Sequence, residues 1–200
     1  MPPKGSFSPE IRQKLETYLS LLEKWQPKIN LISPKTLPDA WNRHFVDSAQ
    51  LAEYLPAGPG ILFDLGSGAG FPGMVLAILR PDLQVHLIES DAKKCAFLQT
   101  VSRETHSPVT VHNARVENVS RETIPKVITA RALSSLKDLL TISADFVAGN
   151  GQILLFPKGE NWVQEVAEAK MLWEFDYVAH SSQTDEKGRI LELRNVRAKG

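Results

Sequence analysis

The chain has 200 residues, of which 42% are hydrophobic and 23% are charged, a composition typical of a single globular domain. One cysteine, Cys95, excludes an internal disulfide, the five histidines have no metal-ligand spacing, and no apolar run is long enough to cross a bilayer. The 23 basic and 23 acidic residues cancel, so net charge neither favours nor excludes a nucleic-acid partner.

Two helices are predicted before the first strand. Ser8 and Pro9 form a helix start, and Pro27 ends that helix. A second helix is predicted over residues 36–54. The apolar residues at helical spacing are Ile11, Leu15, Tyr18, Leu19, Leu22 and Trp25 in the first helix and Trp41, Phe45, Ala49 and Ala52 in the second. We therefore expect an N-terminal helical extension over residues 1–58 that caps a compact core over residues 59–200.

From residue 61 the chain alternates between predicted strands and helices. Such alternation favours parallel strands joined by right-handed crossovers, and the last two strands read as an antiparallel hairpin. The fold class is therefore α/β, a Rossmann-like, mostly parallel sheet with a C-terminal antiparallel hairpin. The predicted strands are 61–65, 84–89, 109–112, 127–130, 152–156, 177–180 and 189–196, and the helices are 72–80, 91–105, 136–147, which Gly149-Asn150-Gly151 stops, and 162–174.

A glycine-rich turn follows the first strand. The apolar strand carries Asp64 at its carboxyl end, where open α/β sheets bind ligands. Gly66, Gly68 and Gly70 let the chain turn sharply and bring bare backbone close to a ligand. The turn predicts a bound cofactor, and a glycine turn without a ligand is the plain alternative.

Two cofactors compete for this turn. The spacing Gly68-x-Gly70-x-x-Gly73, with Glu89 at 21 residues from Gly68, matches the dinucleotide fingerprint, so an NAD(P)-dependent oxidoreductase is one hypothesis. Asp64 opposes it, because a carboxylate repels pyrophosphate. S-adenosylmethionine has no phosphate and is cationic at its ammonium and sulfonium, so it suits Asp64, with Glu89 accepting from the ribose hydroxyls. Five parallel strands closed by a hairpin is also the methyltransferase arrangement, and we favour S-adenosylmethionine.

Nearly the whole chain resembles the bacterial small-subunit ribosomal RNA guanine-N7 methyltransferases, the family also called glucose-inhibited division protein B. No single motif carries this resemblance, but the set is specific. The matching segments are Asn30-Leu31, Arg43-His44-x-x-Asp47-Ser48, the turn Asp64 to Gly73, Lys93-Lys94-x-x-Phe97-Leu98, Arg115-Val116-Glu117, Ala130-Arg131-Ala132 and Lys158-Gly159.

The resemblance implies a role for each matching position. The S-adenosylmethionine contacts it implies, together with those read from the turn, are Asp64, Gly66, Ser67, Gly68, Phe71, Glu89, Val116, Glu117 and Arg131, with Val116 and Glu117 flanking the adenine and Arg131 facing the entering base. The RNA contacts we expect are Asn30, Arg43, His44 and Lys158. For Arg131 the alternative is a structural ion pair with Asp64 or Glu117, for His44 and Asp47 a surface pair, and for Lys158 a plain turn.

The implied reaction methylates N7 of a guanine in 16S ribosomal RNA, as naked RNA or in a small-subunit particle. Because N7 carries a free lone pair, no general base is required, and the sequence offers no obvious catalytic histidine or cysteine. Thr129-Ala130-Arg131-Ala132 stands where enzymes that methylate exocyclic amines carry N/D-P-P-Y/F. A non-catalytic RNA-binding protein on the same fold stays open, and we expect a cytoplasmic monomer with no metal and no membrane partner.

Overall fold

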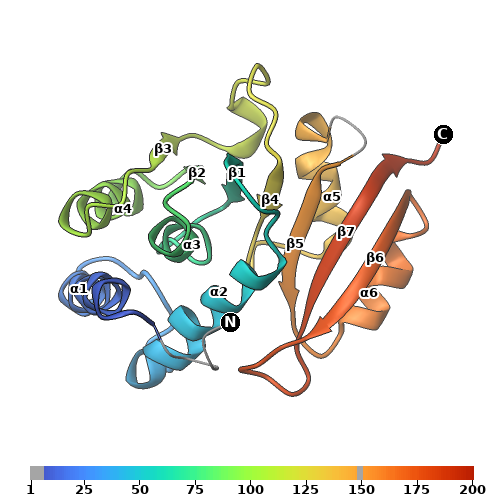
Figure 1. Cartoon of the computed structure of the whole chain (residues 1–200). Helices are drawn as coiled ribbons and strands as arrows, with labels where there is room; N and C mark the ends of the chain where they lie inside the picture. The colour runs from blue at the N-terminus through green and yellow to red at the C-terminus, as the bar shows by residue number, and fades with distance from the viewer. Residues whose placement is uncertain (1–6, 148–150) are drawn as a thin grey trace.

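The computed structural model describes residues 7–147 and 151–200. They form one seven-stranded sheet in the order β3-β2-β1-β4-β5-β7-β6, in which β1 to β5 pair in parallel and β7 is antiparallel to both β5 and β6 (Figure 1). This arrangement confirms the predicted fold class. The strands are β1 Gly60–Leu65, β2 Leu83–Glu89, β3 Thr110–Asn113, β4 Val127–Thr129, β5 Ile153–Lys158, β6 Trp173–Ser181 and β7 Arg189–Ala198.

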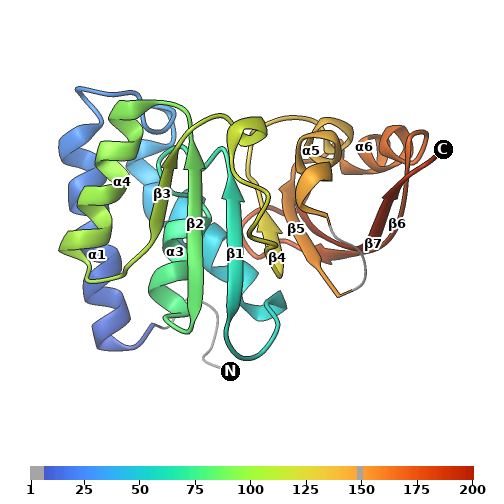
Figure 2. The same cartoon turned by 90° about the horizontal axis from the view of Figure 1, so that it is seen from above.

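Helices cover both faces of the sheet, because each face of a parallel sheet must be buried. Figures 1 and 2 show α1 beside α4 at the β3 end of the sheet, whereas α5 and α6 lie at the β6 end. Residues alternate between the two faces along each strand, so Leu62 packs in the first apolar cluster and Phe63 in the second. The α-helices are α1 Pro9–Trp25, α3 Gly73–Leu79, α4 Ala92–Glu104, α5 Leu136–Ser143 and α6 Trp162–Ala169.

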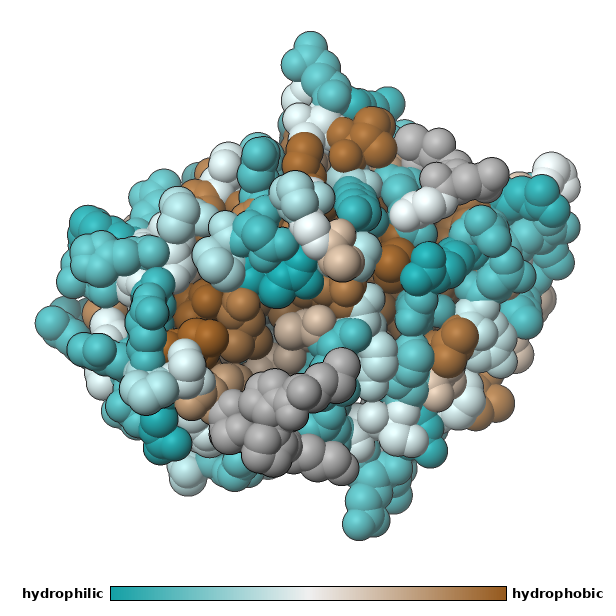
Figure 3. All heavy atoms as spheres, in the orientation of Figure 1, coloured by the Kyte–Doolittle hydropathy of each residue, from teal (hydrophilic) through white to brown (hydrophobic). Residues whose placement is uncertain are grey.

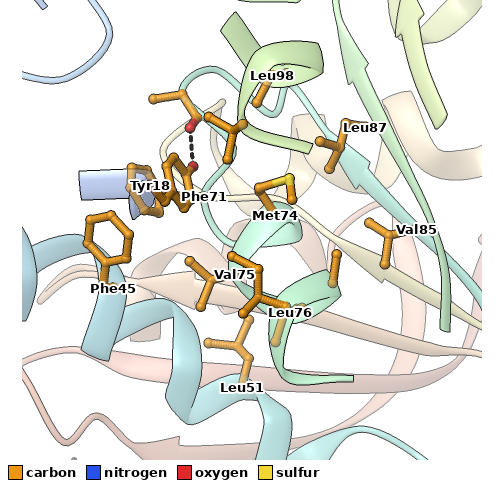
Figure 4. Close-up of a cluster of buried hydrophobic side chains, with 14 of the residues drawn as sticks. Tyr18, Phe45, Leu51, Phe71, Met74, Val75, Leu76, Val85, Leu87 and Leu98 are labelled. Atoms are coloured by element: carbon orange, nitrogen blue, oxygen red, sulfur yellow. Dashed lines mark hydrogen bonds between the residues drawn. The ribbon is translucent and has the colours of Figure 1, made fainter. Parts of the chain in front are cut away.

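The N-terminal segment packs onto the glycine turn through Tyr18 (Figure 4). Tyr18 is fully buried, its ring stacks on Phe71 at 5.3 Å between centroids, and it meets the edge of Phe45 at 4.9 Å. Its hydroxyl donates a hydrogen bond to the carbonyl oxygen of Ala69 within the turn. The extension is therefore built into the same apolar cluster as the turn.

On the face in Figure 3, hydrophilic residues cover most of the surface, and hydrophobic atoms gather between α1 and the strands, where α3 lies.

The prediction of a single helix over residues 36–54 is wrong. The segment is a series of short turns: η1 Leu37–Asp39 and η3 Gln50–Tyr54 are 3-10 helices, η2 Trp41–Val46 is a π-helix, and α2 Asp47–Ala49 is the only α-helical part. The spacing of apolar residues indicates helical turns, but it does not distinguish 3-10, α and π helices. Trp41 and Phe45 stack on each other at 5.6 Å across the wide π turn, a contact that tertiary packing decides.

Other boundaries also differ from the prediction. The last helix ends at Ala169 rather than at 174, and β6 begins at Trp173, because the indole is buried in the second apolar cluster as a strand residue. The helix predicted to 147 changes to a 3-10 turn, η5 Ala144–Phe146. Of the predicted stop signal, residues 149 and 150 lie outside the described residues, and Gly151 has a φ of 97°.

Candidate functional site

A cavity of about 610 Å³ lies over the carboxyl ends of β1 and β2. Its walls come from residues 31–36 and His44 of the N-terminal segment, from the glycine turn, from residues 88–94, from residues 114–117 and from residues 131–133. Every residue predicted to contact a cofactor lines this cavity except Asp64. We refer to it below as the cofactor cavity.

Two glycines of the turn, Gly66 and Gly70, have different structural roles. Gly66 has a φ of 63°, and a Cβ placed there would lie 2.6 Å from Leu133 Cδ1 at the cavity wall. Gly70 has a φ of 94°, and a Cβ there would lie 2.5 Å from the Tyr18 hydroxyl oxygen. Gly70 is not part of the cavity wall. Gly66 therefore keeps the cavity open, whereas Gly70 allows the N-terminal helix to pack against the turn.

Asp64 lies beneath the turn rather than in the cavity. Its side chain is fully buried, with Oδ2 accepting from the Gly73 backbone N–H at 3.2 Å and Oδ1 from the Thr129 hydroxyl at 2.9 Å. Burial raises the pKa of this carboxyl to about 6. The sequence placed Asp64 correctly at the strand end, but alternation along β1 turns its side chain toward the start of α3. Its direct role in the structure is to join the turn, α3 and β4.

Glu89 joins two backbone segments and also faces the cavity. One carboxylate oxygen accepts from the Gly68 N–H at 2.8 Å, and the other accepts from the Asp91 N–H at 2.8 Å. The residue is 8% exposed and lines the cavity. Because a carboxylate has about four acceptor positions, two remain for a ligand.

A mostly apolar slot lies beside Glu89. Val116 is buried there, while Glu117 is exposed at the entrance. Ile88 and Leu133 add further apolar surface. A flat aromatic ring that carries polar atoms at its edge fits such a slot.

Arg131 forms its ion pair with Asp47, not with Asp64 or Glu117. Its Nη1 lies 3.1 Å from Asp47 Oδ2 and donates to the carbonyl oxygen of Arg43 at 3.2 Å. The guanidinium also lies over the Phe71 ring, 5.0 Å from the centroid. With side-chain exposures of 16% for Arg131 and 18% for Asp47, the pair is largely shielded from solvent. Arg131 lines the cofactor cavity, its predicted contact with the cofactor and the entering base stays a prediction, and the alternative partners suggested for it were wrong.

His44 is held in one tautomer by its neighbours. The Thr36 hydroxyl donates to the Ser33 carbonyl at 2.9 Å and therefore accepts from His44 Nε2, also at 2.9 Å. The other ring nitrogen, Nδ1, then accepts from Arg131 Nη2 at 2.9 Å. Burial, followed by the charge of Arg131, lowers the pKa of His44 to about 4. His44 is therefore neutral and orients Arg131.

The four residues predicted to contact RNA differ in their exposure to solvent. Asn30 and Arg43 are exposed, and His44 lines the cofactor cavity. Lys158 has a side-chain exposure of only 8%, because its ammonium pairs with Glu165 at 2.8 Å and donates to the Ser134 carbonyl at 2.8 Å. The expected convergence of Arg43 and Lys158 into an exposed basic patch is therefore absent from the described structure.

Sequence reasoning did not identify Gln26 or the partner of Arg131. The Gln26 side chain accepts from the Leu31 and Ile32 N–H groups at 3.1 Å each and so fixes the loop that lines one cavity wall. No local pattern marks this glutamine. Asp47 stood in a recognised motif, yet its partner lies 84 residues away, so only the folded chain identifies it.

Among the described residues, no group of three histidine, cysteine or acidic side chains is arranged to hold a metal ion. In the same part of the chain, no helix has the length and apolar character needed to span a membrane.

The chain is similar to known methyltransferases in sequence and in fold. Residues 11–193 match the family model described as GidB, rRNA small subunit methyltransferase G. The ribosomal RNA small subunit methyltransferase G of Rhodospirillum centenum is 47% identical over 193 residues, covering 96% of this chain and 88% of that protein. The protein of the same name from Rhizobium leguminosarum is 43% identical, covering 95% of each.

A solved structure shows the same fold at much lower identity. The ribosomal protein L11 methylase of Lactobacillus delbrueckii superimposes with a TM-score of 0.57 at 13% identity, covering 79% of each chain. That identity supports the fold alone, whereas the family match spans most of the sequence. The chain therefore belongs to the rRNA small subunit methyltransferase G family.

Proposed function

We propose that this protein binds S-adenosylmethionine in the cofactor cavity and transfers its methyl group to N7 of a guanine in 16S ribosomal RNA. Family membership supports the reaction, and the cavity supports the cofactor. The single observation that carries the choice of cofactor is the state of the turn's backbone N–H groups. Two carboxylates, Asp64 and Glu89, accept hydrogen bonds from that turn.

A dinucleotide needs free N–H groups at the turn to bind pyrophosphate. Here the described hydrogen bonds use five of them. The Ser67 N–H donates to Ile88 and those of Gly70 and Phe71 to Ser67, while Gly68 donates to Glu89 and Gly73 to Asp64. Most donors of the turn are therefore already occupied, and two of their acceptors are carboxylates. This arrangement favours a cationic, phosphate-free ligand and disfavours the NAD(P)-dependent oxidoreductase.

The residues of the cavity fit an adenosyl group. Glu89 supplies acceptor positions for ribose hydroxyls, and the slot at Val116 accommodates the adenine ring between apolar side chains. Gly66 leaves space for the ligand beside Leu133. Asp64 acts indirectly, because its contacts with Gly73 and Thr129 hold the turn in position.

The cofactor supplies an electrophilic methyl group: the N7 lone pair forms the new C–N bond, the carbon–sulfur bond breaks, and its electron pair stays on sulfur. No proton leaves, so the protein needs no general base, and its task is to align the reactants. The base gains positive charge in this step. Asp47 compensates the charge of Arg131 beside the cavity and so lowers the electrostatic cost of a cationic product.

A transfer assay tests the proposal directly. Labelled S-adenosylmethionine is incubated with small-subunit RNA, either naked or as an assembled particle, and the labelled position is mapped. We expect label at a guanine N7, and calorimetry should detect S-adenosylmethionine binding but not NAD binding. RNA binding without label would instead support the non-catalytic alternative, and NAD binding would support the oxidoreductase. The RNA contacts at Asn30, Arg43 and His44, the monomeric state and the cytoplasmic location stay predictions.

A further inference from the structure

A second cavity, of about 310 Å³, lies next to the cofactor cavity over the ends of β4 and β5. Arg131 and Ala132 line both cavities, so they form the boundary between the two. The other walls come from residues 47–50 of the N-terminal segment, from residues 157–165 and from the connection between β6 and β7. The volume is at the lower end of the range for small-molecule sites, about 300–1,000 Å³, and suits one nucleobase.

The charges around this second cavity balance. Three acidic side chains line it, as do three basic ones: Asp47, Glu165 and Asp185 against Arg131, Lys158 and Arg189. Arg131 pairs with Asp47, and the nearly buried Lys158 pairs with Glu165. An anionic phosphate would need uncompensated cations. The second cavity therefore suits a neutral polar group.

Two polar atoms at this cavity have no hydrogen-bond partner among the described residues. Glu165 Oε2 accepts from the Leu136 N–H at 2.7 Å and pairs with Lys158, but Oε1 accepts no hydrogen bond. The Ser134 hydroxyl is buried and also has no partner. Buried polar atoms are normally satisfied, so the Ser134 hydroxyl is a candidate for a ligand contact, and Glu165, whose side chain is 23% exposed, keeps one carboxylate oxygen free for a ligand. A ligand with donors at one edge would satisfy the carboxylate.

We propose that the second cavity binds the guanine that accepts the methyl group, with Glu165 accepting from N1–H and the N2 amino group. These donors lie on the side of guanine opposite to N7. With them at Glu165, N7 points toward the boundary formed by Arg131 and Ala132, where the methyl group is delivered. Adenine lacks both donors, so the same contact selects guanine over adenine. This inference rests on the proposed function and adds the residue that recognises the base.

The test compares guanine with inosine, which keeps N7 and N1–H but lacks the N2 amino group. Each is placed at the mapped position of the RNA, and kcat/KM for methyl transfer is measured. For the wild-type protein we expect guanine to be preferred by about 10- to 100-fold, the range for losing a hydrogen bond to a charged acceptor. In Glu165→Gln this ratio should fall toward one, while the Kd for S-adenosylmethionine changes less than about twofold.

Glu168→Gln is the matched control, because Glu168 lies on the same helix but outside the second cavity. It should keep the wild-type ratio. An unchanged ratio in Glu165→Gln, or equal use of guanine and inosine by the wild type, would overturn the base contact without affecting the proposed function. No transfer by the wild type to either RNA would overturn both.

A second variant covers the case in which Glu165→Gln does not fold. Ser134→Ala removes a buried hydroxyl that has no partner among the described residues, so thermal unfolding should stay unchanged or shift upward. Since Ser134 lines the second cavity, we expect its hydroxyl to contact the base and kcat/KM to fall about threefold to tenfold in this variant. A fully active Ser134→Ala protein would then count against the second cavity as the guanine site.

Discussion

The two neighbouring cavities are built in different ways. Backbone and apolar side chains form much of the cofactor cavity, and one short segment, residues 66–71, supplies the turn on which it depends. The second cavity has paired charges, contributed by four segments that are far apart in the sequence. The first therefore depends on local chain geometry, and the second on how the N-terminal segment and the hairpin dock onto the core.

This difference predicts which property a mutation in each cavity should affect. A change in the turn should abolish cofactor binding directly, because backbone position is not adjustable there. A change in the charged pairs should affect alignment of the substrate and stability, with less effect on the cofactor. Variants that separate cofactor affinity from transfer rate test this contrast.

The largest effect is expected for Gly66→Val. The backbone there has a φ of 63°, and a Cβ would lie 2.6 Å from Leu133 Cδ1, so the new side chain would strain the turn and occupy the cavity. We expect S-adenosylmethionine binding to be lost in calorimetry while circular dichroism shows a folded protein. Gly58→Val is the control, because its φ is 76° but its Cβ would meet nothing within 4 Å. Wild-type affinity in Gly66→Val would remove the turn from the site.

The sequence predicted the local part of this architecture well. A strand followed by glycines is a short-range signal, and it located Gly66, Gly68 and Glu89 at one cavity, whereas Phe71 was assigned by the family resemblance. The partner of Arg131 was not predictable, because it depends on docking of the N-terminal segment. The π turn at Trp41–Val46 is likewise set by tertiary packing. Buried pairs such as Lys158 and Glu165 could not be distinguished from solvated charges by spacing alone.

Asp47→Ala should damage the second cavity more than the first. Asp47 pairs with Arg131 through Oδ2, and its Oδ1 accepts from Gln50 at 2.9 Å and from Thr184 at 2.6 Å. Removing the carboxylate leaves a shielded guanidinium unpaired and loosens the hairpin connection, so we expect a loss of about 2–4 kcal/mol in unfolding free energy. Methyl transfer should fall more than cofactor affinity.

Asp39→Ala is the control for Asp47→Ala, since the exposed Asp39 carboxylate accepts a hydrogen bond from Asn42, at 2.7 Å, within the same segment. Urea unfolding and transfer kinetics measure the two variants side by side. Equal losses of cofactor affinity and transfer rate in Asp47→Ala would show that the two cavities are not separable.

Glu89→Ala should weaken S-adenosylmethionine binding by about 1–3 kcal/mol, because ribose hydroxyls lose a charged acceptor and the Gly68 N–H loses its partner. Calorimetry gives the change in Kd directly. Glu117→Ala provides a comparison within the same cavity, and its exposed side chain should matter less. A larger effect at Glu117 than at Glu89 would reverse the assignment of the ribose and adenine ends.

The smallest effect expected is a pH dependence at His44, which lines the cofactor cavity and contacts Arg131 at the boundary between the two cavities. The folded pKa is about 4, below the ordinary value of 6.5, so the unfolded chain binds more protons between these values. The contribution of His44 to stability is complete above pH 6.5 and is lost as the pH falls toward 4. Asp64 acts with the opposite sign, since its raised pKa of about 6 makes the stability it contributes disappear as the pH rises from about 4 to 6.

These two groups partly cancel in the wild-type protein, so the difference between wild type and His44→Gln isolates the histidine. Glutamine offers a donor and an acceptor but does not titrate. We expect wild type to lose about 1–2 kcal/mol relative to His44→Gln between pH 6.5 and 4.5 in urea unfolding, allowing for solvent screening. Protonated His44 would also place two cations together and release Arg131 from Nδ1. If the unfolding free energies of the two proteins changed in parallel with pH, the pKa of His44 would be the same in the folded and unfolded chains. The neutral His44 would then not be what orients Arg131.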